Sequence, residues 1–107
     1  MTTFDERQKG EEHKFRHSEE LRFKVRNRRN RLFGQWIAET HLGLSGEAAS
    51  AYAKDVVMAD FELPGDADML DKVKADLAKA GHQLSDHQLH RQLSDLEHVA
   101  KAQVLAE

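Results

Sequence analysis

The sequence of 107 residues contains no cysteine, one proline and six glycines, and each shortage excludes a class of structure. Without cysteine, the chain can form neither a disulfide framework, nor a thiolate zinc site, nor a cysteine nucleophile. So few glycines and prolines leave little to end strands and build hairpins. No apolar run approaches the roughly 18 residues that a membrane span requires, and the polar N-terminus is unlike a secretory signal. We therefore expect a cytoplasmic protein without direct membrane contact.

Strong helix formers dominate the composition, and apolar residues recur at helical spacing in four stretches. Gly43, Pro64–Gly65 and Gly81 separate these stretches by short connections, which favours antiparallel neighbours. The sequence therefore predicts an all-α protein, a small four-helix bundle. The expected core stripes, with Trp36 and Tyr52 assigned to the core, are Leu21, Val25, Leu32 and Trp36 flanked by Phe33 and Ile37; Ala48, Tyr52, Val56, Ala59 and Leu63; Leu70, Val73 and Leu77; and Leu89, Leu93, Leu96, Ala100 and Val104.

The clearest helix start lies before the fourth stretch. Ser85 followed by Gln88 matches a capping box, in which each side chain hydrogen-bonds the other residue's backbone N–H. Leu84 and Leu89 stand where a hydrophobic staple places its two apolar residues. This combination predicts a helix that begins directly after Ser85. The other expected N-caps are Ser45 and Asp66.

The first seventeen residues differ from the rest of the chain. Between Phe4 and Phe15 there is no apolar side chain, so this segment buries too little to offset the entropy of ordering its backbone. Oppositely charged residues at helical spacing nevertheless favour a helix there. We therefore expect residues 1–17 to form a mobile, partly helical arm. Residues 18–107 would form a four-helix domain, with Ser18 as the N-cap of its first helix.

Basic residues are concentrated near the N-terminal end of the chain. Residues 1–31 hold ten basic and six acidic residues, whereas residues 32–107 hold six and thirteen. We interpret the basic run as a solvated helix surface that pairs with acidic neighbours or an acidic partner. The alternative hypothesis is a nucleic-acid-binding module that uses the helix Arg22–Arg31. The run, which contains no acidic residue, comprises Arg22, Lys24, Arg26, Arg28, Arg29 and Arg31.

The sequence contains little that suggests catalysis or metal binding. Two of its histidine pairs, His13 with His17 and His87 with His90, could each share a helix face. Neither pair has a third ligand at a fixed spacing, so we expect no metal site. There is also no glycine-rich phosphate loop and no serine in a nucleophile elbow. We therefore expect a protein that is not an enzyme and that has no cofactor.

Several short strings stand in a fixed order along the first three quarters of the chain. They are Met1–Asp5 with Arg7, Lys14-Phe15 and His17, Glu20-Leu21 and Phe23-Lys24, Arg28-Arg29-Asn30, Leu32, Gly34 and Trp36, Tyr52-Ala53, Val56-Val57, Asp60-Phe61-Glu62, and Pro64-Gly65-Asp66. In this order and spacing they resemble the zeta subunit of the alphaproteobacterial F-type ATP synthase, an inhibitor of that enzyme. The similarity extends over roughly residues 1–77, and the C-terminal helix shares only its helical character.

This resemblance implies a four-helix protein whose N-terminal segment inserts between an alpha and a beta subunit and blocks rotation in the direction of ATP hydrolysis. The implied partners are the alpha and beta subunits, with the gamma subunit as a further candidate. The protein would be monomeric when free and peripheral to the inner membrane through its partner. The implied inhibitory contacts are Phe4, Asp5, Arg7, Lys14 and Phe15.

A further hypothesis concerns the basic helix and adds a regulatory input to inhibition. Some of its arginines could hold the phosphates of ADP or ATP in a weak complex. The candidate contacts for an anion or nucleotide are Arg22, Arg26, Arg28 and Arg29.

Overall fold

The computed structural model describes residues 2–62 and 65–107, with side chains for residues 19–60 and 65–107. Its four helices are α1 (Thr2–Thr40), α2 (Gly46–Glu62), α3 (Ala67–Lys79) and α4 (Asp86–Leu105), and the described ranges contain no strand. The predicted all-α, four-helix class is therefore confirmed. None of the described helices has the length and hydropathy of a membrane span.

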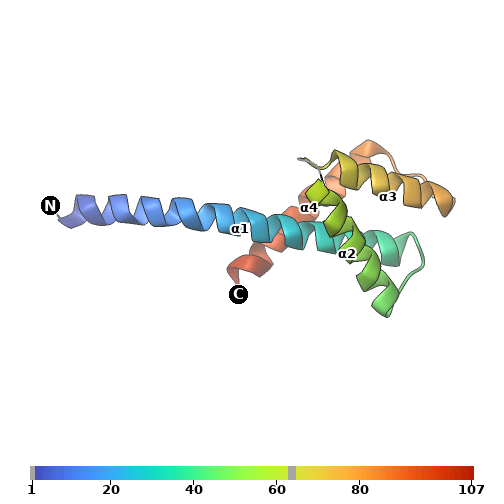
Figure 1. Cartoon of the computed structure of the whole chain (residues 1–107), viewed down its shortest axis with the longest axis horizontal. Coiled ribbons are helices and arrows are strands. Elements are labelled where there is room, and N and C mark those ends of the chain that lie inside the picture. The colour runs from blue at the N-terminus through green and yellow to red at the C-terminus, as the bar shows by residue number, and fades with distance from the viewer. Residues whose placement is uncertain (1, 63–64) are drawn as a thin grey trace.

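The long helix α1 organises the molecule. It packs against both α2 and α4, and α2 in turn packs against α3. The N-terminal half of α1 extends away from the other helices, while the end of α4 lies beside the middle of α1 (Figure 1). The molecule is consequently elongated, with extents of 65 × 26 × 22 Å.

α1 passes through Ser18 without interruption, so the expectation that Ser18 caps a separate helix is wrong. The physical reason is cooperativity, because extending an existing helix costs much less than nucleating a new one. The predicted mobility of residues 1–17 lies outside what the structure describes. The side chains of Phe4 and Phe15 also lie outside the described residues.

The core confirms the predicted stripes of α3 and α4. In α1, the flanking members of the predicted stripe, Phe33 and Ile37, are fully buried, and Trp36 is only partly buried. In α2, Val56 is buried as predicted, but Ala49 and Ala53 are buried in place of Ala48 and Tyr52. The buried face of α1 is the one that α2 and α4 cover, because both helices pack against it. The predicted contribution of Leu63 lies outside the described residues.

Gly34 allows the backbones of α1 and α2 to approach closely. An ideal Cβ at this position would lie 2.8 Å from the Ala53 Cα and 3.0 Å from the Val56 Cβ. Real Cβ atoms do not come so near a neighbouring backbone atom, so a side chain here would require the helices to separate. The glycine therefore sets the distance between the two helices.

The capping box before α4 is confirmed, and the N-cap expected at Asp66 is corrected. The Gln88 N–H donates to the Ser85 Oγ at 3.1 Å, and the Ser85 N–H donates to the Gln88 Oε1 at 2.9 Å, which completes the capping box. Ser45 directly precedes α2. Asp66 occupies the N-cap position of α3 but makes no side-chain capping hydrogen bond. Its carboxylate accepts a hydrogen bond from Arg29 instead, and this pairing competes with the capping geometry.

Candidate functional site

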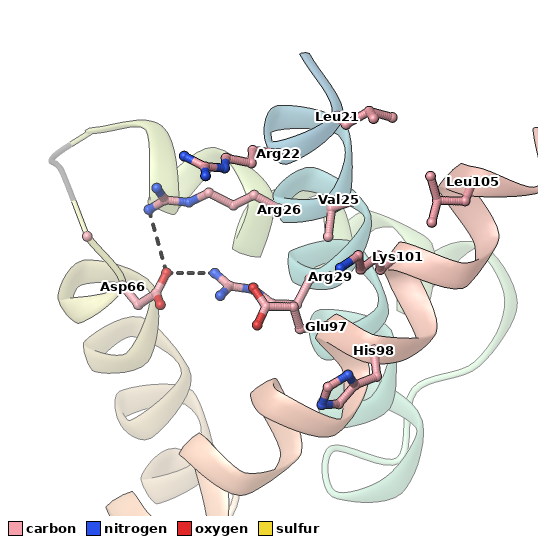
Figure 2. Close-up of a pocket in the computed structure, with 11 residues that line it drawn as sticks. Leu21, Arg22, Val25, Arg26, Arg29, Asp66, Glu97, His98, Lys101 and Leu105 are labelled. Carbon is pink, nitrogen blue, oxygen red and sulfur yellow. Dashed lines mark hydrogen bonds and ion pairs between the residues drawn. The ribbon is translucent and has the colours of Figure 1, made fainter. Parts of the chain in front are cut away.

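A hollow of about 610 Å³ lies between the middle of α1, the start of α3 and the last turns of α4. Its charged side chains come from all three helices, and the apolar side chains of α1 and α4 line one part of it (Figure 2). The α1 residues that line it, from Leu21 to Arg29, lie N-terminal to the buried Phe33 and Ile37. Its lining residues are Leu21, Arg22, Val25, Arg26, Arg29, Gly65, Asp66, Glu97, His98, Lys101 and Leu105.

Asp60, near the end of α2, holds α1 through a buried carboxylate. Its Oδ2 accepts from the Arg26 Nε at 2.7 Å and from the Asn30 Nδ2 at 2.8 Å. Its Oδ1 accepts from the Arg26 Nη2 at 3.0 Å. The Asp60 side chain is only 6% exposed, so these charge-assisted bonds replace the water that the carboxylate loses on burial. The hydrogen bond to Asp60 raises the pKa of the Arg26 guanidinium above its ordinary value.

Arg29 extends this network from α1 to α3. Its Nε and Nη2 donate to the Asn30 Oδ1 at 3.0 and 2.9 Å, and its Nη2 also donates to the Asp66 Oδ1 at 2.7 Å. The Arg26 Nη2 lies 3.5 Å from the same Asp66 oxygen. Arg26, Asp60, Asn30, Arg29 and Asp66 therefore form a closed ring of polar contacts, which we call the polar ring.

Arg28 connects α1 to a different helix. Its Nη1 donates to the Gln103 Oε1 at 3.0 Å, and its Nη2 pairs with the Glu107 carboxylate. Arg28 is not among the residues that line the hollow. One turn of α1 is consequently held to the α2–α3 side of the molecule by the polar ring and to the end of α4 by Arg28.

The structure brings together three of the four arginines predicted to contact an anion. Arg22, Arg26 and Arg29 line the hollow, whereas Arg28 does not. The interpretation of the basic run as a surface that pairs with acidic neighbours is confirmed for Arg26, Arg28 and Arg29. The predicted inhibitory contacts have side chains outside the described residues; they are Phe4, Asp5, Arg7, Lys14 and Phe15.

Sequence reasoning missed Asp60 and Asn30 as members of the site. A signal for Asn30 was present, because it precedes the expected core residue Phe33 by three residues, whereas Asp60 lies outside the expected stripe and shares a buried face with Ala53 and Val56 only in the structure. A polar residue in an apolar stripe must find a hydrogen-bonding partner when it is buried. The contributions of α4 to the hollow left no comparable signal, because they depend on how α4 crosses α1.

A second group of aromatic and titratable side chains lies at the other end of α1. The rings of Trp36 and His41 meet edge to face with centroids 4.9 Å apart, and His82 lies 6.0 Å from His41. The His41 Nε2 is buried without a hydrogen-bond partner in the described part of the chain. Burial, and to a smaller extent the charge of His82, lowers the pKa of His41.

Tyr52, predicted in the core, lies at its edge and ties α2 to α3. Its hydroxyl donates to the Asp76 Oδ2 at 2.9 Å, and the Lys72 Nζ donates to the same oxygen at 3.0 Å. Burial, followed by the interactions with Asp76, raises the pKa of Tyr52. This hydroxyl therefore stays protonated and serves as a structural donor.

The arrangement can hold a negatively charged group, since three guanidinium groups and the Lys101 ammonium line the hollow. Asp66 and Glu97 balance part of this charge. Within the described ranges, no three histidine or acidic side chains gather to hold a metal ion. The site is therefore suited to binding and to holding helices together.

The comparison with protein families gives a match over nearly the whole chain. The family model described as "ATPase inhibitor subunit zeta" matches residues 1–103. Searches of curated proteins and of solved structures found no match.

Proposed function

From the premise that this chain belongs to the ATPase inhibitor subunit zeta family, we propose that residues 1–17 form an inhibitory arm and residues 18–107 a four-helix domain that carries it. The protein is a regulatory, non-enzymatic inhibitor of the F-type ATP synthase. In our proposal the arm enters a catalytic interface between an alpha and a beta subunit. Inhibition then results from obstruction of subunit motion in the direction of ATP hydrolysis.

The projection of α1 supports this proposal more than any other observation. Thr2–Thr40 is one helix, and its N-terminal half extends away from the other helices (Figure 1). At 1.5 Å per residue, the sixteen residues from Thr2 to His17 span about 24 Å. A helix of this length can reach into a cleft while the four-helix domain stays outside. The gamma subunit, which rotates within such an enzyme, is a third candidate partner.

The contacts of the arm are proposed from its sequence. Phe4 and Phe15 would supply the apolar anchors, because buried aromatic side chains contribute much of the free energy of binding at protein interfaces. Asp5, Arg7 and Lys14 would add polar contacts with the partner. Gly10 disfavours the helix by about 1 kcal/mol relative to alanine, so the partner surface would stabilise the helical form of the arm.

Substitution of the anchors tests the proposal in the full chain. We expect Phe4→Ala and Phe15→Ala to weaken inhibition of ATP hydrolysis without lowering the free energy of unfolding. The matched control is Phe23→Ala, which removes the same side chain from α1 outside the proposed arm. Deletion of residues 1–17 should abolish inhibition while circular dichroism still shows a helical domain. A deletion variant that inhibits as strongly as the full chain would refute the proposal.

A nucleotide is proposed as a regulatory ligand of the hollow, because Arg22, Arg26, Arg29 and Lys101 line it. ADP or ATP phosphates would compete with Asp66 for Arg29. A titration with ADP followed by NMR should shift signals of residues around the hollow. Arg29→Gln should weaken this response, and Arg28→Gln, whose arginine lies outside the hollow, should leave it unchanged. A titration without shifts would remove nucleotide from the proposal.

A further inference from the structure

α1 is held on two sides at one helical turn, Arg26–Asn30, where this helix leaves the bundle. N-terminal to this turn, Leu21 and Val25 are only half-buried, Arg22 and Lys24 are exposed, and the helix continues away from its neighbours (Figure 1). C-terminal to it, Phe33 and Ile37 enter the core. The turn between them therefore holds the charged contacts that lie nearest to the projecting part of the helix.

Asp60 is the central acceptor on one side of this turn. It accepts all three of its hydrogen bonds from α1, two from Arg26 and one from Asn30. Asn30 is 1% exposed and its carbonyl oxygen is occupied by Arg29, so it cannot turn away without losing both sets of contacts. Arg29 in turn reaches Asp66 at the start of α3. The α2–α3 corner thus contacts α1 at more than one point along the turn.

Arg28 supplies the contact on the other side, to Gln103 and Glu107 at the end of α4. A helix held on one face alone can tilt away from that face. A helix held by two neighbours over the same turn resists tilting in both directions, because any tilt breaks charged contacts. These contacts are directional, unlike apolar packing, which is roughly proportional to buried area and tolerates small rotations.

We infer that Asp60 is a positioning residue for inhibition: through Arg26 and Asn30 it sets the direction in which α1 carries the N-terminal arm out of the bundle. This inference rests on the proposed inhibitory role of the arm. Its physical basis is preorganisation, since a helix that already points correctly loses less freedom on binding. A helix that samples many directions binds more weakly in proportion to the fraction of molecules in the competent direction.

The direction of the arm can be measured in the full chain by electron paramagnetic resonance. The sequence has no native cysteine, so spin labels at Glu20→Cys and Lys79→Cys, two exposed positions outside the proposed arm, report one distance, between α1 and the end of α3. Without nucleotide present, we expect Asp60→Asn to broaden this distance distribution. Asp55→Asn, which removes the same charge from an exposed position of α2, should leave the distribution as it is in the parent chain.

Inhibition is measured on the same variants without labels, at a temperature where circular dichroism shows each to be folded. Suppose that the fraction of molecules whose arm points in the competent direction falls to between about a tenth and a third. The inhibitor concentration that gives half-maximal inhibition then rises roughly threefold to tenfold. Val73→Ala separates positioning from general stability, because Val73 is buried in the core and is not a member of the polar ring. This substitution should lower the free energy of unfolding without changing the distance distribution or inhibition.

If Asp60→Asn fails to fold, Arg26→Gln removes two of the three hydrogen bonds to Asp60, from a side chain that is 43% exposed. The inference is overturned if the folded variant keeps a narrow distance distribution, or if the distribution broadens and inhibition stays unchanged. It is also overturned if Val73→Ala weakens inhibition as much as Asp60→Asn does. Phe4→Ala keeps the two proposals distinguishable. If Phe4→Ala abolishes inhibition and Asp60→Asn has no effect on it, only the positioning role of Asp60 is refuted. Full inhibition by Phe4→Ala counts against the inhibitory arm itself.

Discussion

Two successive stretches of α1 contact the rest of the bundle by different chemistry. Arg26–Asn30 make charged and polar contacts to α2, α3 and α4, whereas Phe33–Ala38 contribute buried apolar side chains and the close approach at Gly34. The apolar stretch determines how near the helices lie. The polar stretch occupies the edge of the bundle, where the core ends and directional bonds can still hold the helix. The same helix thus uses burial for cohesion and charge for orientation.

The largest effect in this comparison should come from Gly34→Ala in the apolar stretch. Overpacking of a helix contact lowers the free energy of unfolding by about 1–3 kcal/mol. The higher helix propensity of alanine raises it by about 1 kcal/mol. Because the new Cβ would meet the backbone of Ala53 at 2.8 Å, we expect a net loss in the free energy of unfolding, measured by urea denaturation. Gly10→Ala makes the same change in the projecting half of α1 and should raise helicity. Equal effects of the two substitutions would show that the close approach is unimportant.

A smaller loss in the free energy of unfolding, one that depends on salt, should follow from Asp66→Asn in the polar ring. Its carboxylate is 32% exposed, and ion pairs that are open to solvent contribute up to about 1 kcal/mol. The loss should shrink as salt is raised from about 20 mM to about 500 mM, since added ions screen exposed charges. Asp71→Asn, an exposed change on the same helix α3, is the control. A loss that is independent of salt would mean that Asp66 acts through packing.

The smallest effect should be a pH dependence at the apolar end of α1. Burial lowers the pKa of His41 below its ordinary value of 6.5, so the folded state favours the neutral imidazole. The unfolded state therefore binds more protons as pH falls, and stability declines below about pH 6.5 until the folded protein also titrates. Thermal unfolding at pH 7.5 and 5.5 measures this decline. His82, whose ring lies 6.0 Å away, adds repulsion when it is charged.

The control for this pH dependence is His87→Gln on the exposed surface of α4. His41→Gln should reduce the pH dependence, and His87→Gln should preserve it. Asp86 does not contribute to the change between pH 7.5 and 5.5. The hydrogen bond from Lys74 lowers its pKa from an ordinary value of 3.8, so this carboxylate titrates below that pH range. Identical pH profiles for His41→Gln and the parent chain would exclude His41 as the source.

The elements that the sequence predicts well are those whose signals are local. The capping box at Ser85 and Gln88 involves residues three apart, and it is present as predicted. The stripes of α3 and α4 are also correct, because each of these helices buries one narrow face. In α1 the flanking residues Phe33 and Ile37 are the buried ones, and in α2 most of the buried stripe lies one residue further along, since adjacent apolar residues such as Leu32 and Phe33 offer two neighbouring faces. The choice between those faces depends on the neighbouring helices.

The candidate site follows the same division. The basic run and its preference for acidic partners are visible in the sequence. The sequence does not show which acidic residue each arginine contacts. Arg26 pairs with Asp60, 34 residues away, and Arg28 pairs with Glu107, 79 residues away. Arg26 and Arg28 are two residues apart on α1, so their side chains point in different directions around the helix. Their partners are decided by which helix lies on each side.

The sequence by itself determined that this chain is helical, where its helices end, and that its first residues carry too few apolar side chains to build a core of their own. These properties depend on hydrogen bonds, caps and spacings within a few residues. Only the tertiary structure decided which face of α1 is buried, which arginines are neutralised and where the helix leaves the bundle. Those outcomes depend on contacts between residues far apart in the chain, whose geometry exists only after the helices have packed.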